Sequence, residues 1–383
     1  MSAATKSTDF ARVLFGESAF VAGAVTAAVF FAIGDRLLTG LDNPLWFGLV
    51  LFWQFAVMVW CAFRVVHHAD ALAELLGEPY GTLILTISVV SIEVTIIATM
   101  MLTGSPNPTL PRDTMFAILM IVLNGMIGLS LAVGALRHTQ QHYNLEGAIA
   151  YLAVISSLAV IALVIPEFTH STFKPMFTPT QAAVFGLLTA LLYGVFLIIQ
   201  TTRHRDFFKD SKNDTESPLL TEPYPRRENY PVSHSLLVHV VLLFATLLPI
   251  ILLSKPLGLV LDYGIEQQGM PTALGAIFIA ILILSPEGVA AVQAAYANHL
   301  QRAVNLSLGS ALSTIGLTVP VVLTIGILAD IPLEFGLSYI EIVLLALTLF
   351  VCRMTFSGAP TNVLLGFVHL VLFFTFIVLI FEP

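Results

Sequence analysis

Charged residues are scarce in this chain. Of its 383 residues only 10% are charged and 57% are hydrophobic, whereas soluble domains carry about 25% charged residues. A folded soluble protein needs polar groups to cover its surface. The composition therefore excludes a cytosolic enzyme, a nucleic-acid binder and a disordered scaffold, and predicts an integral membrane protein whose surroundings are the lipid bilayer.

Cysteine and catalytic motifs are also scarce. Cys61 and Cys352 both fall in apolar stretches, so a disulfide framework is not indicated. The His-Glu-x-x-His motif of an intramembrane metalloprotease is absent, and His369 is the only candidate base for a serine hydrolase. We therefore predict that the chain is not an enzyme and has no cofactor.

Long apolar runs are abundant. A bilayer core about 30 Å thick needs roughly 20 apolar residues per helix. On that basis the sequence predicts an all-α membrane protein with about eleven transmembrane helices, at residues 15–34, 45–66, 80–102, 113–136, 147–166, 179–202, 234–254, 272–297, 304–328, 337–357 and 360–381.

The basic residues predict the orientation. An N-terminus inside the cell puts 12 of the 16 Lys and Arg residues on the cytoplasmic side, and leaves only Arg36, Arg112, Lys174 and Lys255 outside. Because cytoplasmic loops are rich in Lys and Arg, we expect a cytoplasmic N-terminus and an external C-terminus. The polar segment 203–233, with four prolines, is then a cytoplasmic linker between two halves or, alternatively, a regulatory loop.

Two glutamates fall near the middle of predicted spans. Glu93 lies in the third span and Glu287 in the eighth. A charge at the bilayer centre costs about 2.5–3.5 kcal/mol on insertion scales, so such a residue is read by default as part of a functional site.

The two glutamates belong to a repeat. Ser-Ile-Glu ending at Glu93 matches Ser-Pro-Glu ending at Glu287, and Ile-Gly-Leu-Ser ending at Ser130 matches Ile-Gly-Leu-Thr ending at Thr318. The copies are five spans apart, so they cross the membrane in opposite directions, as in the inverted repeats of secondary transporters. We predict an extra helix in residues 1–44, five-helix repeats in 45–202 and 234–383, and the linker 203–233 between them.

The polar groups around the glutamates suit a hard cation. Pro286 lacks an N–H, which frees the carbonyl oxygen of Leu282 to act as a ligand. Carboxylate, hydroxyl and amide oxygens bind Ca²⁺ or alkali cations rather than zinc or copper. The expected cation and proton ligands are Glu93 and Glu287, which bind the metal ion directly, with Ser91, Ser285, Asn124, Ser310, Ser313, Thr314 and the Leu282 carbonyl.

This ligand set predicts exchange of cations for protons. Two carboxylates in one low-dielectric cavity repel each other, so an empty site holds protons and a loaded site is ionised. Cation and proton then compete for the same oxygens, and alternating access exchanges them. A cation channel or an uncoupled transporter is the alternative. His369 is expected either to relay protons or to form an interhelical hydrogen bond. Glu78 is expected either to cap a helix or to lie at the entrance of the ion path.

The chain resembles the calcium/cation antiporter superfamily, in particular its bacterial ChaA-type branch. The resemblance rests on Gly-Glu-Pro-Tyr-Gly-Thr-Leu at 77–83, continuing to Glu93, and on Ser-Pro-Glu-Gly at 285–288 with Leu-Gly-Ser ending at Ser310. It implies that Glu93 and Glu287 are the paired acidic residues that bind cation and proton in turn. It also implies transport of Ca²⁺, Na⁺ or K⁺ across the bacterial inner membrane.

One departure from that pattern bears on selectivity. Plant and fungal relatives carry Gly-Asn ahead of each repeat glutamate, whereas this chain has Val-Val at 89–90 and Ile-Leu at 283–284. Ca²⁺ takes six to eight oxygen ligands, so the loss of two side-chain amides favours monovalent cations. No oligomeric state is predicted.

Overall fold

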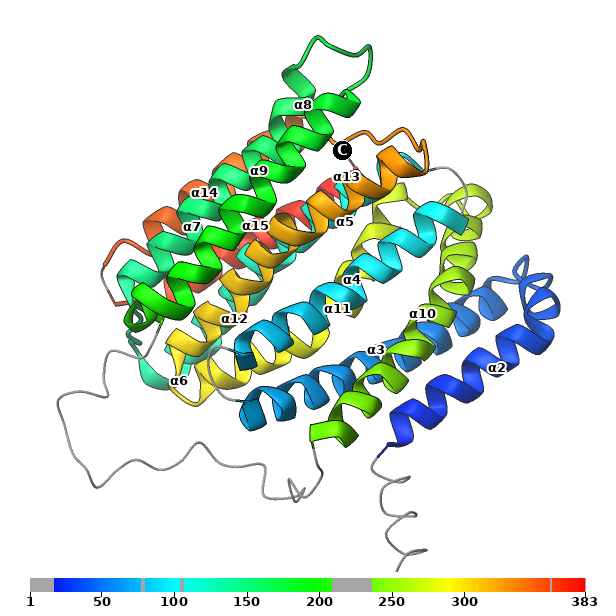
Figure 1. Ribbon diagram of the computed structural model, residues 1–383, viewed down its shortest axis with the longest axis horizontal. Coiled ribbons are helices and arrows are strands. Elements are labelled where there is room, and N and C mark those ends of the chain that lie inside the picture. Colours follow the sequence, from blue (N-terminus) through cyan, green and yellow to red (C-terminus); the bar gives the residue numbers. More distant parts are fainter. Residues whose placement is uncertain (1–16, 77–79, 104–106, 209–235, 359, 383) are drawn as a thin grey trace, which may run out of the picture. The chain divides into compact units, whose positions relative to one another are not determined.

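The protein is all-helical over the residues that its computed structural model describes, which are 17–76, 80–103, 107–208, 236–358 and 360–382 (Figure 1). Within these ranges no strand forms, and the only extended pairings are the isolated bridges Gln141–Thr361 and Met176–Glu334. The prediction of an all-α protein is confirmed.

Nine helices in the described residues are long and apolar enough to cross a membrane, which makes the chain a multi-pass membrane protein. They run over Ser18–Leu38, Pro44–Leu76, Leu110–His138, Leu145–Phe168, Pro179–Arg203, Leu236–Gln267, Thr272–Tyr296, Leu300–Leu328 and Val363–Phe381. The two remaining predicted spans contain α4 (Tyr80–Thr103), whose apolar part is Thr86–Leu102, and α14 (Tyr339–Thr355).

The chain forms two compact units. Unit 1 comprises Met1–Asn107 and Ser235–Ser285, and unit 2 comprises Pro108–His234 and Pro286–Pro383. Unit 1 contains α2 (Ser18–Leu38), α3 (Pro44–Leu76), α4, α10 (Leu236–Gln267) and the first part of α11 (Thr272–Tyr296). In this unit α3 and α10 pack against each other and each of them also packs against α2 and α4.

Unit 2 contains the second part of α11 and the remaining helices. Its long elements are α5 (Leu110–Met120), η1 (Ile121–Met126), α6 (Ile127–His138), α7 (Leu145–Ala159), α9 (Pro179–Ile198), α12 (Leu300–Ser313), η5 (Thr314–Thr318), α13 (Val319–Leu328), α14 and α15 (Val363–Phe381). The short segments are η2 (Val160–Val164), α8 (Ile165–Phe168), η3 (Ile199–Arg203) and η4 (Arg205–Phe208).

Glycine lets α6 and α15 approach closely in unit 2. A Cβ atom on Gly366 would lie 2.5 Å from the backbone nitrogen of Ala132, and one on Gly128 would lie 2.9 Å from Cβ of His369. Small residues permit this kind of backbone contact between membrane helices. The contact places His369 of α15 beside the segment that carries Asn124.

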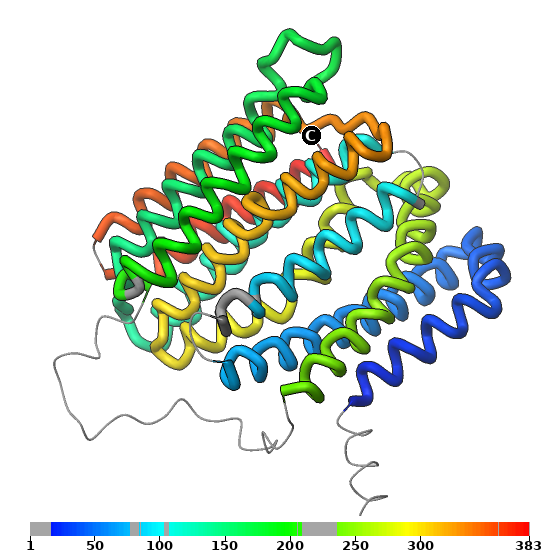
Figure 2. The backbone as a smooth tube through the Cα atoms, viewed as in Figure 1, coloured from blue at the N-terminus to red at the C-terminus, as the bar shows by residue number. Residues whose placement is uncertain are grey.

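Two helices are longer than predicted. α3 continues to Leu76 rather than ending near residue 66, and α10 continues to Gln267 rather than ending near residue 254. Pro249 and Pro256 lie inside α10, which curves along its length (Figure 2). Proline kinks a helix without ending it when neighbouring groups satisfy the freed backbone.

Candidate functional site

Glu287 lies in α11, in the part that belongs to unit 2. The side chain is half-buried, and the Ser310 hydroxyl of α12 donates a hydrogen bond to its Oε2. The Ser313 hydroxyl in turn donates to the carbonyl oxygen of Ser310 at 3.0 Å. Three predicted ligands, Glu287, Ser310 and Ser313, therefore come together within one unit.

Pro286 precedes Glu287 inside α11. Because proline has no N–H, the carbonyl of Leu282 loses the donor that an intact helix would give it. Leu282 is fully buried, so its carbonyl oxygen is a buried acceptor on the helix that carries Glu287.

Glu93 lies in α4 of unit 1 and is 1% exposed. Ile92, Ile96 and Ile97 of the same helix are buried as well. A carboxylate so deeply buried is stable only when it is protonated or bound to a partner.

Ser91 and Ser285 precede the two glutamates in the same way. The Ser91 hydroxyl donates to the carbonyl of Ile87 at 2.6 Å, and the Ser285 hydroxyl donates to the carbonyl of Ile281. Each hydroxyl uses its proton within its own helix. Its oxygen lone pairs remain able to accept a hydrogen bond or to bind a cation.

Asn124 and Thr314 lie in segments with π-helical hydrogen bonding. Asn124 belongs to η1 and Thr314 to η5, in the middle of the spans Leu110–His138 and Leu300–Leu328. Short π-helical segments are rare and occur frequently at functional sites. Both residues are buried.

The Asn124 side chain takes part in a neutral hydrogen-bond network. Its Nδ2 donates to Oγ1 of Thr348 on α14 at 2.9 Å, and its Oδ1 lies 3.3 Å from Nδ1 of His369. Nε2 of His369 lies 2.9 Å from Oγ1 of Thr355. His369 thus makes interhelical hydrogen bonds that fix the orientation of the Asn124 carboxamide.

Unit 1 contains a second hydrogen-bond network, which is charged and which the sequence did not predict. Arg64 of α3 donates to both carboxylate oxygens of Glu17, with Nε at 2.9 Å from Oε2. Nε2 of His68 lies 3.1 Å from Oε2 of Glu17, and Nδ1 of His68 lies 3.2 Å from Nδ1 of His239. Sequence spacing gives no signal for this cluster, because its partners are 47 to 171 residues apart.

Glu17 stands just outside the first membrane helix. Burial raises the pKa of its carboxyl group, but the hydrogen bonds and charges of Arg64 and His68 outweigh burial and lower the pKa to about 2. The carboxylate is therefore ionised at every physiological pH.

Glu78 falls outside the described residues. Among the residues that the structure describes, no three His, Cys, Asp or Glu side chains converge as a metal-binding group.

Comparison with known proteins agrees with this architecture. The family model described as sodium/calcium exchanger protein matches residues 45–202 and 238–382. The Sinorhizobium fredii protein y4hA is 42% identical over 332 residues, which are 86% of this chain and 88% of that protein. The sodium-potassium/proton antiporter ChaA of Escherichia coli is 41% identical over 323 residues, with 84% and 85% coverage.

A solved structure shares the fold. The Ca²⁺/H⁺ antiporter protein YfkE matches with a TM-score of 0.70 at 18% identity, over 95% of this chain and 99% of that one. The described helices and the polar groups buried among them define a multi-pass membrane protein with ionisable groups in its spans. The chain belongs to the sodium/calcium exchanger protein family, and the resemblance to cation antiporters seen in the sequence is confirmed.

Proposed function

We propose that this protein is a secondary active antiporter that exchanges Na⁺, K⁺ or Ca²⁺ for protons across the bacterial inner membrane. The observation that carries the proposal is 41% identity with a sodium-potassium/proton antiporter over most of both chains. This relationship favours antiport over the alternatives of a channel or an uncoupled transporter.

The proposed topology has eleven spans, with an inverted repeat of five and five helices after one extra helix. In this topology α4 and α14 are two further spans beside the nine helices that are long and apolar enough to cross a membrane. Two observations support the repeat: the family model matches two stretches, 45–202 and 238–382, and η1 and η5 interrupt corresponding spans with π-helical turns. The basic residues favour a cytoplasmic N-terminus and central loop, with the C-terminus outside.

Glu93 and Glu287 are the proposed residues at which cation and proton compete. Ser310 supports this role for Glu287, because a hydroxyl that donates to an ionised carboxylate makes a strong, charge-assisted hydrogen bond. The same hydroxyl oxygen can accept a hydrogen bond once the carboxyl group is protonated. Ser310 therefore suits both forms of Glu287. Ser91, Ser285, Ser313, Thr314, Asn124 and the Leu282 carbonyl are the proposed supporting oxygens.

The cation that fits best is monovalent. Residues 89–90 and 283–284 before the two glutamates are aliphatic and supply no side-chain oxygen. Ca²⁺ needs six to eight oxygen ligands. We therefore propose Na⁺ and K⁺ as the preferred substrates and Ca²⁺ as a weaker one, with no resident cofactor.

The test is proton flux in reconstituted vesicles with an acidic interior. Na⁺, K⁺ and Ca²⁺ are added separately, and collapse of the pH gradient is recorded for the wild type, Glu93→Gln, Glu287→Gln and the exposed control Glu146→Gln. We expect at least one cation to collapse the gradient, both buried variants to abolish that response and the control to retain it. Activity in both buried variants would contradict the proposal.

A further inference from the structure

Two buried serine hydroxyls in unit 2 have no hydrogen-bond partner. They belong to Ser130 of α6 and Ser307 of α12, which are 2% and 0% exposed. A buried hydroxyl without a partner costs about 1–3 kcal/mol, so two of them in one place require an explanation.

Several other serines in the described helices avoid this cost. Their hydroxyls donate to the backbone carbonyl four residues earlier, as at Ser88, Ser91, Ser157, Ser254 and Ser285. Ser130 and Ser307 do not use this local partner. Their hydroxyls are instead directed into the space between α6 and α12.

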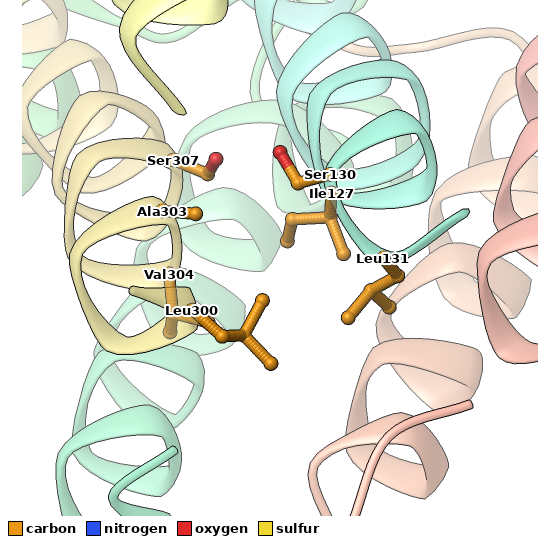
Figure 3. Close-up of a pocket in the computed structure, with 7 residues that line it drawn as sticks. All are labelled: Ile127, Ser130, Leu131, Leu300, Ala303, Val304 and Ser307. Carbon is orange, nitrogen blue, oxygen red and sulfur yellow. The ribbon is translucent and has the colours of Figure 1, made fainter. Parts of the chain in front are cut away.

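That space is a crevice within unit 2. It holds about 170 Å³ that protein atoms do not fill, and its walls are otherwise aliphatic. Figure 3 shows the hydroxyls of Ser130 and Ser307 pointing toward each other across it, with Leu131 and Leu300 at one end. No part of the crevice is wide enough for a water molecule, so its hydration requires α6 and α12 to move apart.

The residues that line the crevice favour water over a cation as its occupant once the crevice widens. No ionised side chain lines it, and a dehydrated cation needs charge or several oxygen ligands. Water needs two to four polar partners, and the two serine hydroxyls supply two. An apolar constriction such as Leu131 and Leu300 controls hydration by excluding water when it is narrow.

Helix α12 connects the crevice with the carboxylate of Glu287, because it carries both Ser307 and Ser310. Ser307 precedes Ser310 by three residues on α12, so the two side chains lie on the same side of the helix. Ser310 is the residue whose hydroxyl donates to Glu287. Water beside Ser130 and Ser307 would therefore begin a line of hydroxyl oxygens that ends at this carboxylate.

We propose that the crevice between α6 and α12 is a water-binding site through which Glu287 exchanges protons with one side of the membrane, separately from the transported cation. This inference rests on the proposed antiport. In each transfer an oxygen receives one proton from its neighbour and releases its own to the next oxygen, so every O–H bond broken is replaced. The last proton converts the Glu287 carboxylate to its acid.

The route has a defined side of the membrane. The crevice involves the C-terminal helix of the span Leu110–His138 and the N-terminal helix of the span Leu300–Leu328. In the proposed orientation both ends face the cytoplasm. Protons therefore exchange between Glu287 and the cytoplasm through unit 2.

The test compares two fluxes in the same vesicles. The first is cation/proton antiport driven by a pH gradient, and the second is exchange of labelled Na⁺ for unlabelled Na⁺ at equal pH, with K⁺ or Ca²⁺ used instead if that is the cation transported. The variants are Ser130→Ala, Ser307→Ala and their combination. Ser157→Ala on α7 is the matched control, because it removes an exposed hydroxyl that is bonded to Ala153.

We expect the double variant to lose antiport by about tenfold or more, as for removal of proton-transfer groups, while cation exchange and the control stay unchanged. An equal loss of both fluxes would overturn the proposal, because it would indicate damage to the cation site or the fold. Unchanged antiport would overturn it too, because it would place proton access elsewhere. Absence of coupling in the wild type would instead refute the antiport function itself, and the inference with it.

Discussion

The two units hold their helices together with polar networks of different kinds. In unit 1 the network is charged: Glu17, before α2, binds Arg64 and His68 of α3, and His68 contacts His239 of α10. In unit 2 the network is neutral: Asn124 of η1 binds Thr348 of α14 and His369 of α15, and His369 contacts Thr355. Each network joins three elements that are distant in sequence.

The difference affects how each unit responds to loss of one member. Removing one partner from a buried ion pair leaves an uncompensated charge, which costs more than an unsatisfied neutral group. A charged network also depends on the protonation of its carboxylate, whereas the amide and hydroxyl groups of the unit 2 network do not titrate in the ordinary pH range and only its imidazole, His369, is titratable. Unit 1 should therefore be the more fragile unit.

Glu17→Ala should give the largest effect. It leaves Arg64 and His68 in a mostly buried position without their anion, and we expect the free energy of unfolding to fall by about 3 kcal/mol or more. The measurement is the apparent melting temperature in detergent, with hydrogen exchange read helix by helix. Exchange should rise in α2, α3 and α10.

The control for this variant is Glu266→Ala, which removes an exposed glutamate from α10. We expect it to change stability by no more than about 0.5 kcal/mol. If Glu17→Ala behaved like Glu266→Ala, the charged network would contribute nothing to unit 1.

Asn124→Ala should give a smaller effect in unit 2. It leaves the buried groups of Thr348 and His369 without a partner, at a cost of about 1–3 kcal/mol. Hydrogen exchange should rise in α14 and α15 and stay unchanged in α2. Thr375→Val is the matched control, since its hydroxyl is exposed and bonds only within α15. If Asn124→Ala lowered the free energy of unfolding more than Glu17→Ala, unit 2 would be the more fragile unit.

Acid should weaken the charged network of unit 1 by protonating Glu17. The pKa of Glu17 is about 2 in the folded protein against an ordinary value of 4.5. The ionised carboxylate therefore stabilises the fold fully above pH 4.5, and this stabilisation is lost as the pH falls through about 2. The difference in melting temperature between wild type and Glu17→Gln should shrink over this range. If the difference in melting temperature stayed constant, Arg64 and His68 would not be stabilising the ionised form of Glu17.

The sequence predicts the helices of this protein well because hydrophobicity is a local property. Each of the eleven predicted spans contains a helix, yet the ends of α3 and α10 were wrong. Arg64 near the predicted end of α3 resembles a loop residue in sequence, but Glu17 neutralises it inside the fold. Lys255 and Pro256 resemble a boundary in the same way, although α10 continues through them.

The candidate site divides along the same line. Glu93, Glu287 and their preceding serines are predicted from spacing and repetition, which are properties of the sequence itself. The bond from Ser310 to Glu287 fits the predicted grouping, because both positions belong to the second repeat. The charged network of unit 1 and the facing hydroxyls of Ser130 and Ser307 depend on contacts between distant helices, for which spacing gives no signal.

The measurement that tests the account most directly is the coupling ratio in reconstituted vesicles. A fixed proton gradient is imposed, and the opposing Na⁺ or K⁺ gradient that stops net flux is determined by titration (Ca²⁺ if neither is carried). If the protein is an antiporter, this balancing cation gradient is a fixed power of the proton gradient. For Glu287→Gln we expect no cation gradient to balance the proton gradient. A balancing cation gradient that does not change with the imposed proton gradient would contradict antiport.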